Sequence, residues 1–330
     1  MQHNWTIEEK HLELKYTWKI SRNTSDFKTN FIIRIADENY SGIGEVAPNS
    51  RYNESPELIK EQFIKFLSVI PFQIASVEEL QQHLNKVVVC NSLRFGIESA
   101  FIHYLCKRDK ITIYNLLNIK PPVLINTAYT LPIMEIGSIQ DFIKNNDLSR
   151  FKHIKIKVNR EKGFDTIKEV SKYIPQPLMV DANEDWKNVE DLIRFMEQVK
   201  KINIRFIEQP LPSSHNEEYM YLKKYSLFEL MADESIIATA DFGLLKKQFD
   251  GVNMKLMKAG GYLNGLSILN AARKNGMKIM IGCMIETSLG ISSAMHLCNG
   301  VDYVDLDGCF ILKDEPFGLL KENEGQLKFT

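Results

Sequence analysis

The chain has 330 residues with 41 basic and 42 acidic side chains, so its formal net charge is −1. This balance lacks the basic excess of a nucleic-acid or membrane surface. No apolar run approaches the roughly 18 residues that cross a bilayer, and the start MQHNWTIEEK has no apolar signal core. Five widely spaced cysteines without a CxxC motif fit a reducing compartment. We therefore expect a cytoplasmic protein without nucleic-acid or membrane partners.

Residues 1–120 predict an α+β domain. Strand-like stretches at residues 5–20, 30–36 and 42–46 precede helical patterns, of which residues 92–107 are the clearest. Strands followed by helices, rather than strands alternating with helices, are typical of an α+β unit. The Pro121–Pro122 pair then predicts a domain boundary.

Residues 121–310 alternate short apolar strands with amphipathic helices such as residues 189–199. This alternation predicts a parallel (β/α)8-type barrel with an incomplete last helix. The tail, residues 311–330, shows no further repeat, and we expect it to return to the N-terminal domain. The expected strands are residues 124–129, 153–158, 177–182, 204–208, 228–232, 252–256, 278–282 and 302–306.

Charged side chains recur at the ends of the predicted strands, where barrel enzymes place their chemistry. Each alone would be explained as a solvated loop residue. Five of them are spaced by 24, 27, 25 and 22 residues, about one β-α unit each, which predicts equivalent positions around one mouth. They are Lys157, Asp181, Glu208, Asp233 and Lys255.

The carboxylates in this set predict a metal site. Asp181, Glu208 and Asp233 would repel one another and raise one another's pKa if left bare. A hard divalent cation resolves this, and oxygen ligands without Cys or His favour Mg²⁺ or Mn²⁺ over zinc. We expect one Mg²⁺ per subunit. A structural ion-pair network with neighbouring lysines is the alternative.

Two lysines suit proton transfer. Lys155 and Lys157 lie two apart on a strand and point to the same side, which can lower a lysine pKa toward the working range of a base. Lys157 on the second strand and Lys255 on the sixth face each other across the mouth. A planar intermediate between them could lose a proton on one face and gain one on the other, with a metal stabilising the enediolate.

Five motifs together carry a family resemblance: KIK at 155–157, DAN at 181–183, EQP at 208–210, DES at 233–235 and KLMKAGG at 255–261. With them the chain resembles the muconate-lactonising-enzyme subgroup of the enolase superfamily over nearly its whole length. The resemblance implies a modified (β/α)7β barrel with an N-terminal α+β capping domain. The implied site residues are Asp181, Glu208 and Asp233 as magnesium ligands, Lys157 and Lys255 as acid/base lysines, and Lys155 as a carboxylate or enolate partner.

The last strand discriminates among activities of this subgroup. It ends VDLDG, which places Asp305 and Asp307 on one side at the mouth. Paired carboxylates suit a substrate ammonium group, and the DxD resembles the motif by which dipeptide epimerases hold the substrate's N-terminal amine. GCMIETSLG at 282–290 is similar to that group too. A turn or capping role before Gly308 is the alternative. We also expect Thr130 and Met284 to contact the substrate.

We therefore expect a dipeptide epimerase, an isomerase that inverts the α-carbon of the C-terminal residue of Ala-Xaa dipeptides. The expected partner is this small-molecule substrate, and we expect a homo-oligomer. The enzymatic alternatives are an N-acylamino-acid racemase and an o-succinylbenzoate synthase. A barrel that binds metal and ligand without turnover belongs to a different class.

The second residue of the dipeptide depends on two loops, residues 21–28 and 48–54. Arg22 is the candidate to bind a side-chain carboxylate, which would make the protein an L-Ala-D/L-Glu epimerase, and Arg51 is a rival cation. Asp26 could neutralise Arg22, while Phe27 and Tyr52 offer apolar surface. We therefore expect small and apolar second residues to be accepted, with Ala-Glu no better than comparable.

Overall fold

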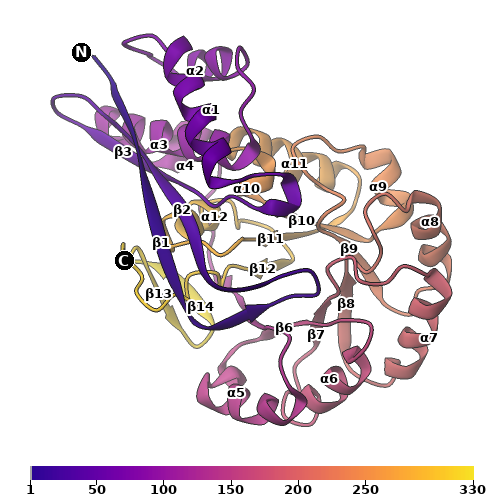
Figure 1. Ribbon diagram of the computed structural model, residues 1–330. Coiled ribbons are helices and arrows are strands. Elements are labelled where there is room, and N and C mark those ends of the chain that lie inside the picture. Colours follow the sequence, from indigo (N-terminus) through magenta and orange to yellow (C-terminus); the bar gives the residue numbers. More distant parts are fainter. Residues whose placement is uncertain (1) are drawn as a thin grey trace.

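The computed structural model describes residues 2–330. Its N-terminal part is an antiparallel sheet of three strands in the order β1 (Asn4–Lys19), β2 (Thr24–Ala36) and β3 (Ser41–Val46), drawn in indigo in Figure 1. A helical turn, η1 (Ser50–Tyr52), and four helices follow. These are α1 (Pro56–Val69), α2 (Val77–Leu84), α3 (Asn91–Asp109) and α4 (Ile113–Leu117). The predicted α+β capping domain is thus confirmed in its strands and in its longest helix.

Helix α3 packs directly against β3. A Cβ on Gly42 would lie 2.0 Å from the carbonyl oxygen of Ala100, and one on Gly44 would lie 2.2 Å from that of Gly96. Such contacts are far inside van der Waals distance, so only glycine allows this approach. The close packing holds β2 and β3 as a firm base for the turn at residues 20–23 and for η1.

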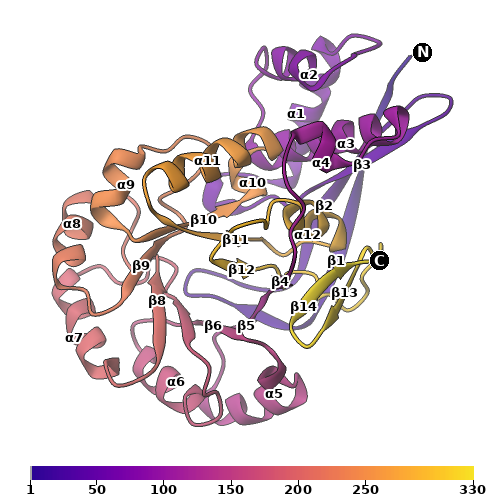
Figure 2. The same cartoon turned by 180° about the vertical axis from the view of Figure 1, so that it is seen from behind.

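The second part is a barrel of eight parallel strands, seen from behind in Figure 2. Seven helical segments separate the strands and none follows the last strand before the C-terminal tail, which confirms the (β/α)7β form. The strands are β5 (Ala128–Leu131), β6 (His153–Lys157), β7 (Leu178–Asp181), β8 (Ile204–Glu208), β9 (Glu229–Ala232), β10 (Gly251–Lys255), β11 (Lys278–Gly282) and β12 (Tyr303–Asp305).

The connecting segments form the outer layer of the barrel. Short helical turns, η2 (Ile136–Ser138) and η3 (Leu148–Arg150), flank the first of its helices. The helices are α5 (Ile139–Asn145), α6 (Gly163–Val170), α7 (Val189–Val199), α8 (Asn216–Tyr225), α9 (Phe242–Gln248), α10 (Leu256–Ala259) with α11 (Tyr262–Lys274), and α12 (Ser288–Met295). Among the helices of residues 2–330, none combines the length and apolar character that a membrane span requires.

Two expectations about the ends of the barrel need correction. The first predicted strand, residues 124–129, is two strands in the structure. β4 (Ile125–Asn126) lies outside the barrel, and β5 is the first strand of the barrel. The tail forms a hairpin, β13 (Leu320–Asn323) and β14 (Gln326–Phe329), and β14 pairs with β4 rather than with the N-terminal sheet. Only the start of the tail meets that sheet, where Leu312 bridges Leu14. The hairpin thus uses the strand edge that β4 offers outside the barrel.

Side chains, rather than a backbone ladder, join the first and last barrel strands. The sheet order runs from β12 to β5 without a hydrogen-bonded pairing of these two. Instead, the Leu306 N–H donates to Thr127 Oγ1 at 2.8 Å, and the Thr130 N–H donates to Asp307 Oδ2 at 2.6 Å. The nearly closed barrel therefore uses one of its predicted site residues, Asp307, at the seam.

An apolar layer fills the barrel below the mouth. Alternate residues of a strand point to the same face, and each member of this layer precedes a residue at the mouth by two positions. The strands therefore present a charged upper layer on an apolar floor, which keeps water from reaching the site from below. The floor consists of Ala128, Met179, Phe206, Met231, Met280 and Tyr303, and the residues above are Thr130, Asp181, Glu208, Asp233, Gly282 and Asp305.

Candidate active site

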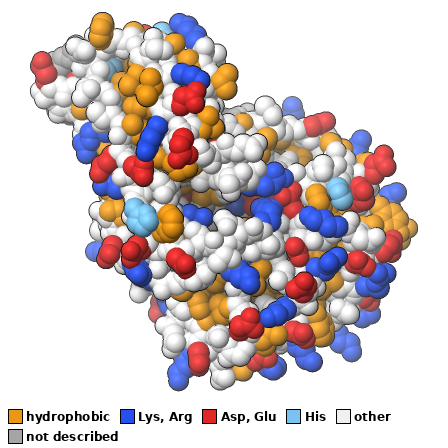
Figure 3. Space-filling model, viewed as in Figure 1, with side chains coloured by type: hydrophobic (Ala, Val, Ile, Leu, Met, Phe, Trp, Pro, Cys, Tyr) orange, Lys and Arg blue, Asp and Glu red, His pale blue; other side chains and the backbone are white. Residues whose placement is uncertain are grey.

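A cavity of about 610 Å³ lies between the barrel mouth and the loops of the capping domain. Its lining combines strand ends of the barrel with residues of the 20–23 turn, β2 and η1. Figure 3 shows this face of the molecule hollowed between the two parts, with basic side chains at the hollow. The volume is in the range of pockets that enclose small molecules.

Lys155 on β6 is the hub of the charged layer. Its ammonium nitrogen lies 3.0 Å from Asp181 Oδ2, 2.8 Å from Glu208 Oε2 and 2.9 Å from Asp305 Oδ2. Burial acts to lower the pKa of Lys155, but the surrounding carboxylates outweigh it and raise this pKa well above its ordinary value. Lys155 is therefore an ammonium group paired with carboxylates from three other strands.

Lys157 and Lys255 stand at the ends of β6 and β10, which are separated by three strands on either side of the barrel. The Lys157 ammonium donates to Asp181 Oδ2 at 2.8 Å and to Asn183 Oδ1 at 3.0 Å. The Lys255 ammonium donates to Asp233 Oδ2 at 2.8 Å. Burial acts to lower the pKa of Lys255, yet Asp233 raises it above its ordinary value. The two amines thus flank the mouth from opposite sides.

Asp181, Glu208 and Asp233 lie fully or almost fully buried at the ends of neighbouring strands. Burial and the nearby Asp181 raise the pKa of Glu208 to about 8, and its Oε2 has no hydrogen-bond partner within residues 2–330. That oxygen meets only the Lys155 ammonium, as an ion pair without hydrogen-bond geometry.

These carboxylates fit a hard divalent cation by donor type. They are buried, all-oxygen and gathered at one mouth, and Glu208 keeps an unsatisfied oxygen there. Lysine ammonium groups pair with the carboxylates in this structure. Among residues 2–330, no three acidic, His or Cys groups stand in a metal-binding arrangement. The predicted network of lysines and the predicted metal ligands are therefore the same set of side chains.

Two further polar residues belong to this layer and were given no role from the sequence. Asn253 donates to Glu208 Oε1 at 2.8 Å, and the Lys258 ammonium donates to Asp233 and, at 3.2 Å, to the Asn253 carbonyl. Asn253 lies two residues before Lys255 on β10, so the same alternation that linked Lys155 to Lys157 could have found it. Burial lowers the pKa of Lys258.

The carboxylates of the DxD pair, Asp305 and Asp307, accept hydrogen bonds from residues of other strands rather than from a local turn. Asp305 accepts from Lys155, and Asp307 accepts the Thr130 N–H; Thr130 Oγ1 also donates to Asp305 at 3.3 Å. Burial, with the nearby Asp305 charge, raises the pKa of Asp307 to about 7. Both carboxylates line the cavity. Among residues 2–330 no ion pair engages Asp307, so a substrate ammonium group is the charge partner that this pair can still bind.

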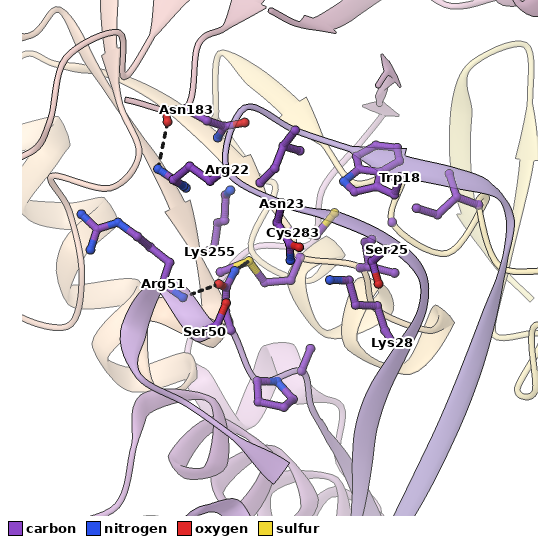
Figure 4. A pocket seen from close by; sticks show the side chains of 18 of the residues that line it. Trp18, Arg22, Asn23, Ser25, Lys28, Ser50, Arg51, Asn183, Lys255 and Cys283 are labelled. Carbon is purple, nitrogen blue, oxygen red and sulfur yellow. Dashed lines mark hydrogen bonds between the residues drawn. The ribbon is translucent and has the colours of Figure 1, made fainter. Parts of the chain in front are cut away.

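Arg22 and Arg51 tie the two capping loops to the barrel. Arg22 donates to Glu184 and to Glu234 at 2.6 Å each, and to the Asn183 carbonyl at 2.9 Å, the bond dashed in Figure 4. Arg51 makes a bidentate pair with Glu184 at 2.8 and 2.9 Å. Asn183 and Glu184 adopt left-handed φ values of 44° and 65°, a turn that follows β7.

The partner predicted for Arg22 is wrong. Asp26 accepts from Thr17 at 2.6 Å, and the acids that neutralise Arg22 are Glu184 and Glu234. The predicted neutralisation of Arg22 is therefore present, but through residues of the barrel. Met284 does line the cavity, where Asn49 Nδ2 lies 3.5 Å from its sulfur.

A family model described as enolase C-terminal domain-like matches residues 140–307, which hold most of these strand ends. The chain belongs to this family. It is 31% identical to an L-Ala-D/L-amino acid epimerase of Pedosphaera parvula, over 97% of this chain and 94% of that protein. It is 29% identical to one of Flavobacterium johnsoniae, over 94% and 91% of the two chains.

Among solved structures, the chain is similar to a dipeptide epimerase of Enterococcus faecalis complexed with Mg and the dipeptide L-Leu-L-Tyr. This chain is 25% identical to it, with a TM-score of 0.90 over 100% of this chain and 98% of that one. The architecture of capping domain and barrel is therefore shared over the full length.

Proposed function

We propose that this enolase-family protein is a dipeptide epimerase, an isomerase that inverts the α-carbon of the C-terminal residue of Ala-Xaa dipeptides. The observation that carries the proposal is the placement of two lysine amines, Lys157 and Lys255, on opposite strands of one mouth beside a pair of buried carboxylates. Inversion needs a proton removed from one face of a carbon and returned on the other, which two opposed amines can do.

The roles follow from the charges at the mouth. Lys157 or Lys255, depending on the stereoisomer, takes the α-proton, and the other returns a proton to the opposite face. Asp305 and Asp307 hold the substrate ammonium, and Lys155 meets the substrate carboxylate. Asp181, Glu208 and Asp233 would hold one Mg²⁺, which when bound supplies a Lewis-acid charge that stabilises the carboxylate as negative charge develops on it.

The walls of the cavity support small and apolar second residues. Ile20, Phe27, Met284 and Ile285 line it together with Thr130. Arg22 faces the same space, but its guanidinium is engaged by two barrel carboxylates. An Arg that is already neutralised offers little binding energy to a second carboxylate, since that carboxylate would have to displace a formed ion pair.

The compartment and assembly are part of the same proposal. All five cysteines are free thiols, which supports a reducing cytoplasm. Ile64 and Leu67 on α1 and Phe72 beyond it expose apolar surface, which supports a homo-oligomer.

A dipeptide library incubated with protein and Mg²⁺ in D₂O tests the proposal. We expect free-amine Ala-Xaa dipeptides to be inverted and to take up deuterium at the α-carbon. Proton NMR measures both changes. Exchange only in N-acylated amino acids would indicate an N-acylamino-acid racemase, and turnover only of a succinylcyclohexadiene acid would indicate an o-succinylbenzoate synthase. No exchange in any of these would indicate a binding protein and overturn the proposal.

A further inference from the structure

One basic side chain of the cavity has no partner for its charge. Among residues 2–330, neither an ion pair nor a hydrogen bond engages the ammonium of Lys28, although the other basic groups of the lining are each held by a carboxylate. The basic residues of the lining are Arg22, Lys28, Arg51, Lys155, Lys157 and Lys255.

Lys28 lies on the face of β2 that looks toward the barrel. Asn30, two residues further along, donates to the Ile285 carbonyl of the barrel at 3.0 Å, so this face of β2 meets the mouth. Figure 4 shows the Lys28 side chain reaching into the pocket from one side, while Arg22, Arg51 and Lys255 lie on the other. The free charge is thus separate from the paired cations.

An apolar cluster lies beside Lys28 on the neighbouring strand. The cross-strand neighbour of Lys28 is Leu12, which packs in a buried cluster with Ile285 and Ile311. The latter two also line the cavity. Burial lowers the pKa of Lys28, because a half-buried ammonium has lost water without gaining a partner. An anion delivered to this wall would therefore gain a charge-assisted hydrogen bond with little competition.

An Ala-Xaa substrate with an acidic second residue has one carboxylate that the assignments above leave without a partner. Its ammonium is assigned to Asp305 and Asp307, and its α-carboxylate to Lys155 and to the Mg²⁺ that Asp181, Glu208 and Asp233 would hold. Lys28 and Ile285 line the cavity, and Lys28 lies across it from Lys255 (Figure 4). We therefore assign this wall to the side chain of the second residue. A second carboxylate on the substrate can only come from that side chain.

We infer that Lys28 is a specificity residue that binds the side-chain carboxylate of an acidic second residue, glutamate or aspartate, and so extends the substrate range beyond small and apolar dipeptides. This inference rests on the proposed function. Binding of the side-chain carboxylate is thus assigned to Lys28 on β2. It is not assigned to Arg22, whose guanidinium is bound to Glu184 and Glu234.

The test compares L-Ala-L-Glu with its neutral isostere L-Ala-L-Gln, so that shape is constant and charge varies. For the wild type we expect kcat/KM to favour Ala-Glu over Ala-Gln at least tenfold. Lys28→Met keeps the apolar stem and should lower the Glu/Gln ratio to near one, while Lys28→Arg should retain most of it. Lys10→Met is the matched control, since Lys10 is on the same hairpin, paired with Glu8 and outside the lining.

Each outcome decides the matter. A wild type that treats Ala-Glu and Ala-Gln alike overturns the inference without any variant. A Glu/Gln ratio unchanged in Lys28→Met, with Ala-Val still inverted, also overturns it. Loss of Ala-Glu, Ala-Gln and Ala-Val turnover to the same degree assigns Lys28 a structural role instead. A wild type inactive on every dipeptide, Ala-Val included, refutes the proposed function itself.

Discussion

Lys157 and Lys255 hold matching positions on opposite sides of the barrel mouth: each ammonium donates at 2.8 Å to a carboxylate at a strand end, Asp181 for the first and Asp233 for the second. The strands that carry them, β6 and β10, have three strands between them in either direction around the barrel. In the proposed function each lysine therefore acts beside its own carboxylate, and a substrate carbon held between them would present one face to each.

Removing either amine should separate exchange from inversion. We expect Lys157→Ala and Lys255→Ala each to lower the rate of epimerisation by at least about a thousandfold, which lies within the usual contribution of general acid–base catalysis. Each variant should still exchange the α-proton of the stereoisomer that faces the remaining lysine, measured by NMR in D₂O. Lys162→Ala, an exposed lysine paired with Glu135, is the control. Epimerisation at the wild-type rate in either variant would refute the two-base assignment.

Metal removal should abolish activity. We expect EDTA to stop turnover and Mg²⁺ to restore it, and Asp233→Asn to weaken Mg²⁺ binding in calorimetry because a neutral amide replaces an anionic ligand. Glu197→Gln, an exposed acid on α7 paired with Lys200, should bind Mg²⁺ as the wild type does. Full activity in metal-free buffer contradicts the assignment of the three carboxylates.

The charge of Asp307 should matter only for substrates with a free amine. Asp307→Asn keeps an oxygen that can accept the Thr130 N–H and removes the carboxylate charge. We expect kcat/KM to fall for Ala-Xaa dipeptides by an amount equivalent to about 2–5 kcal/mol, as when one partner of a desolvated charge pair is lost. N-acetylated dipeptides should lose little. Equal losses on both substrate types would make Asp307 a residue of the barrel seam alone.

Arg22 should anchor a loop rather than select a substrate. Because Glu184 and Glu234 hold its guanidinium, Arg22→Ala should lower kcat/KM to a similar degree for Ala-Ala, Ala-Val and Ala-Glu. Glu184→Gln should have a similar effect, since it also frees Arg51. A loss above about a hundredfold for Ala-Glu alone, equivalent to roughly 2.8 kcal/mol, would show that Arg22 binds the substrate carboxylate.

Stability should depend on pH through Glu98. Burial raises the pKa of this α3 carboxyl from 4.5 to about 7. Since the native state then binds its proton more tightly, the contribution of Glu98 to the free energy of unfolding should be largest below pH 4.5 and fall by up to about 3 kcal/mol as pH rises to 7. In denaturant titrations, the difference in free energy of unfolding between wild type and Glu98→Gln should fall by this amount over that pH range, whereas the difference between wild type and Glu61→Gln, an exposed acid on α1, should not change with pH. An unchanged pH profile in Glu98→Gln contradicts the assignment.

The sequence by itself determined the barrel strands and the residues at their ends. Apolar runs of strand length are local patterns, and a spacing of one β-α unit places Lys157, Asp181, Glu208, Asp233 and Lys255 at equivalent positions without knowledge of any contact. The two-residue alternation predicted in the same way that Lys155 accompanies Lys157 into the mouth. These features are periodic, so neighbouring residues are enough to predict them.

Only the tertiary structure decided which charges are already paired. Arg22 finds its partners 162 and 212 residues away, in Glu184 and Glu234, rather than four residues away in Asp26. Lys28 has no partner of opposite charge within the described residues 2–330. The tail hairpin likewise pairs with β4, which lies two hundred residues earlier in the chain: Gln326 pairs with Asn126. Ion pairs and strand pairings of this range depend on how the capping domain docks on the barrel, and no local pattern records that docking, because a charge selects its partner by distance in space.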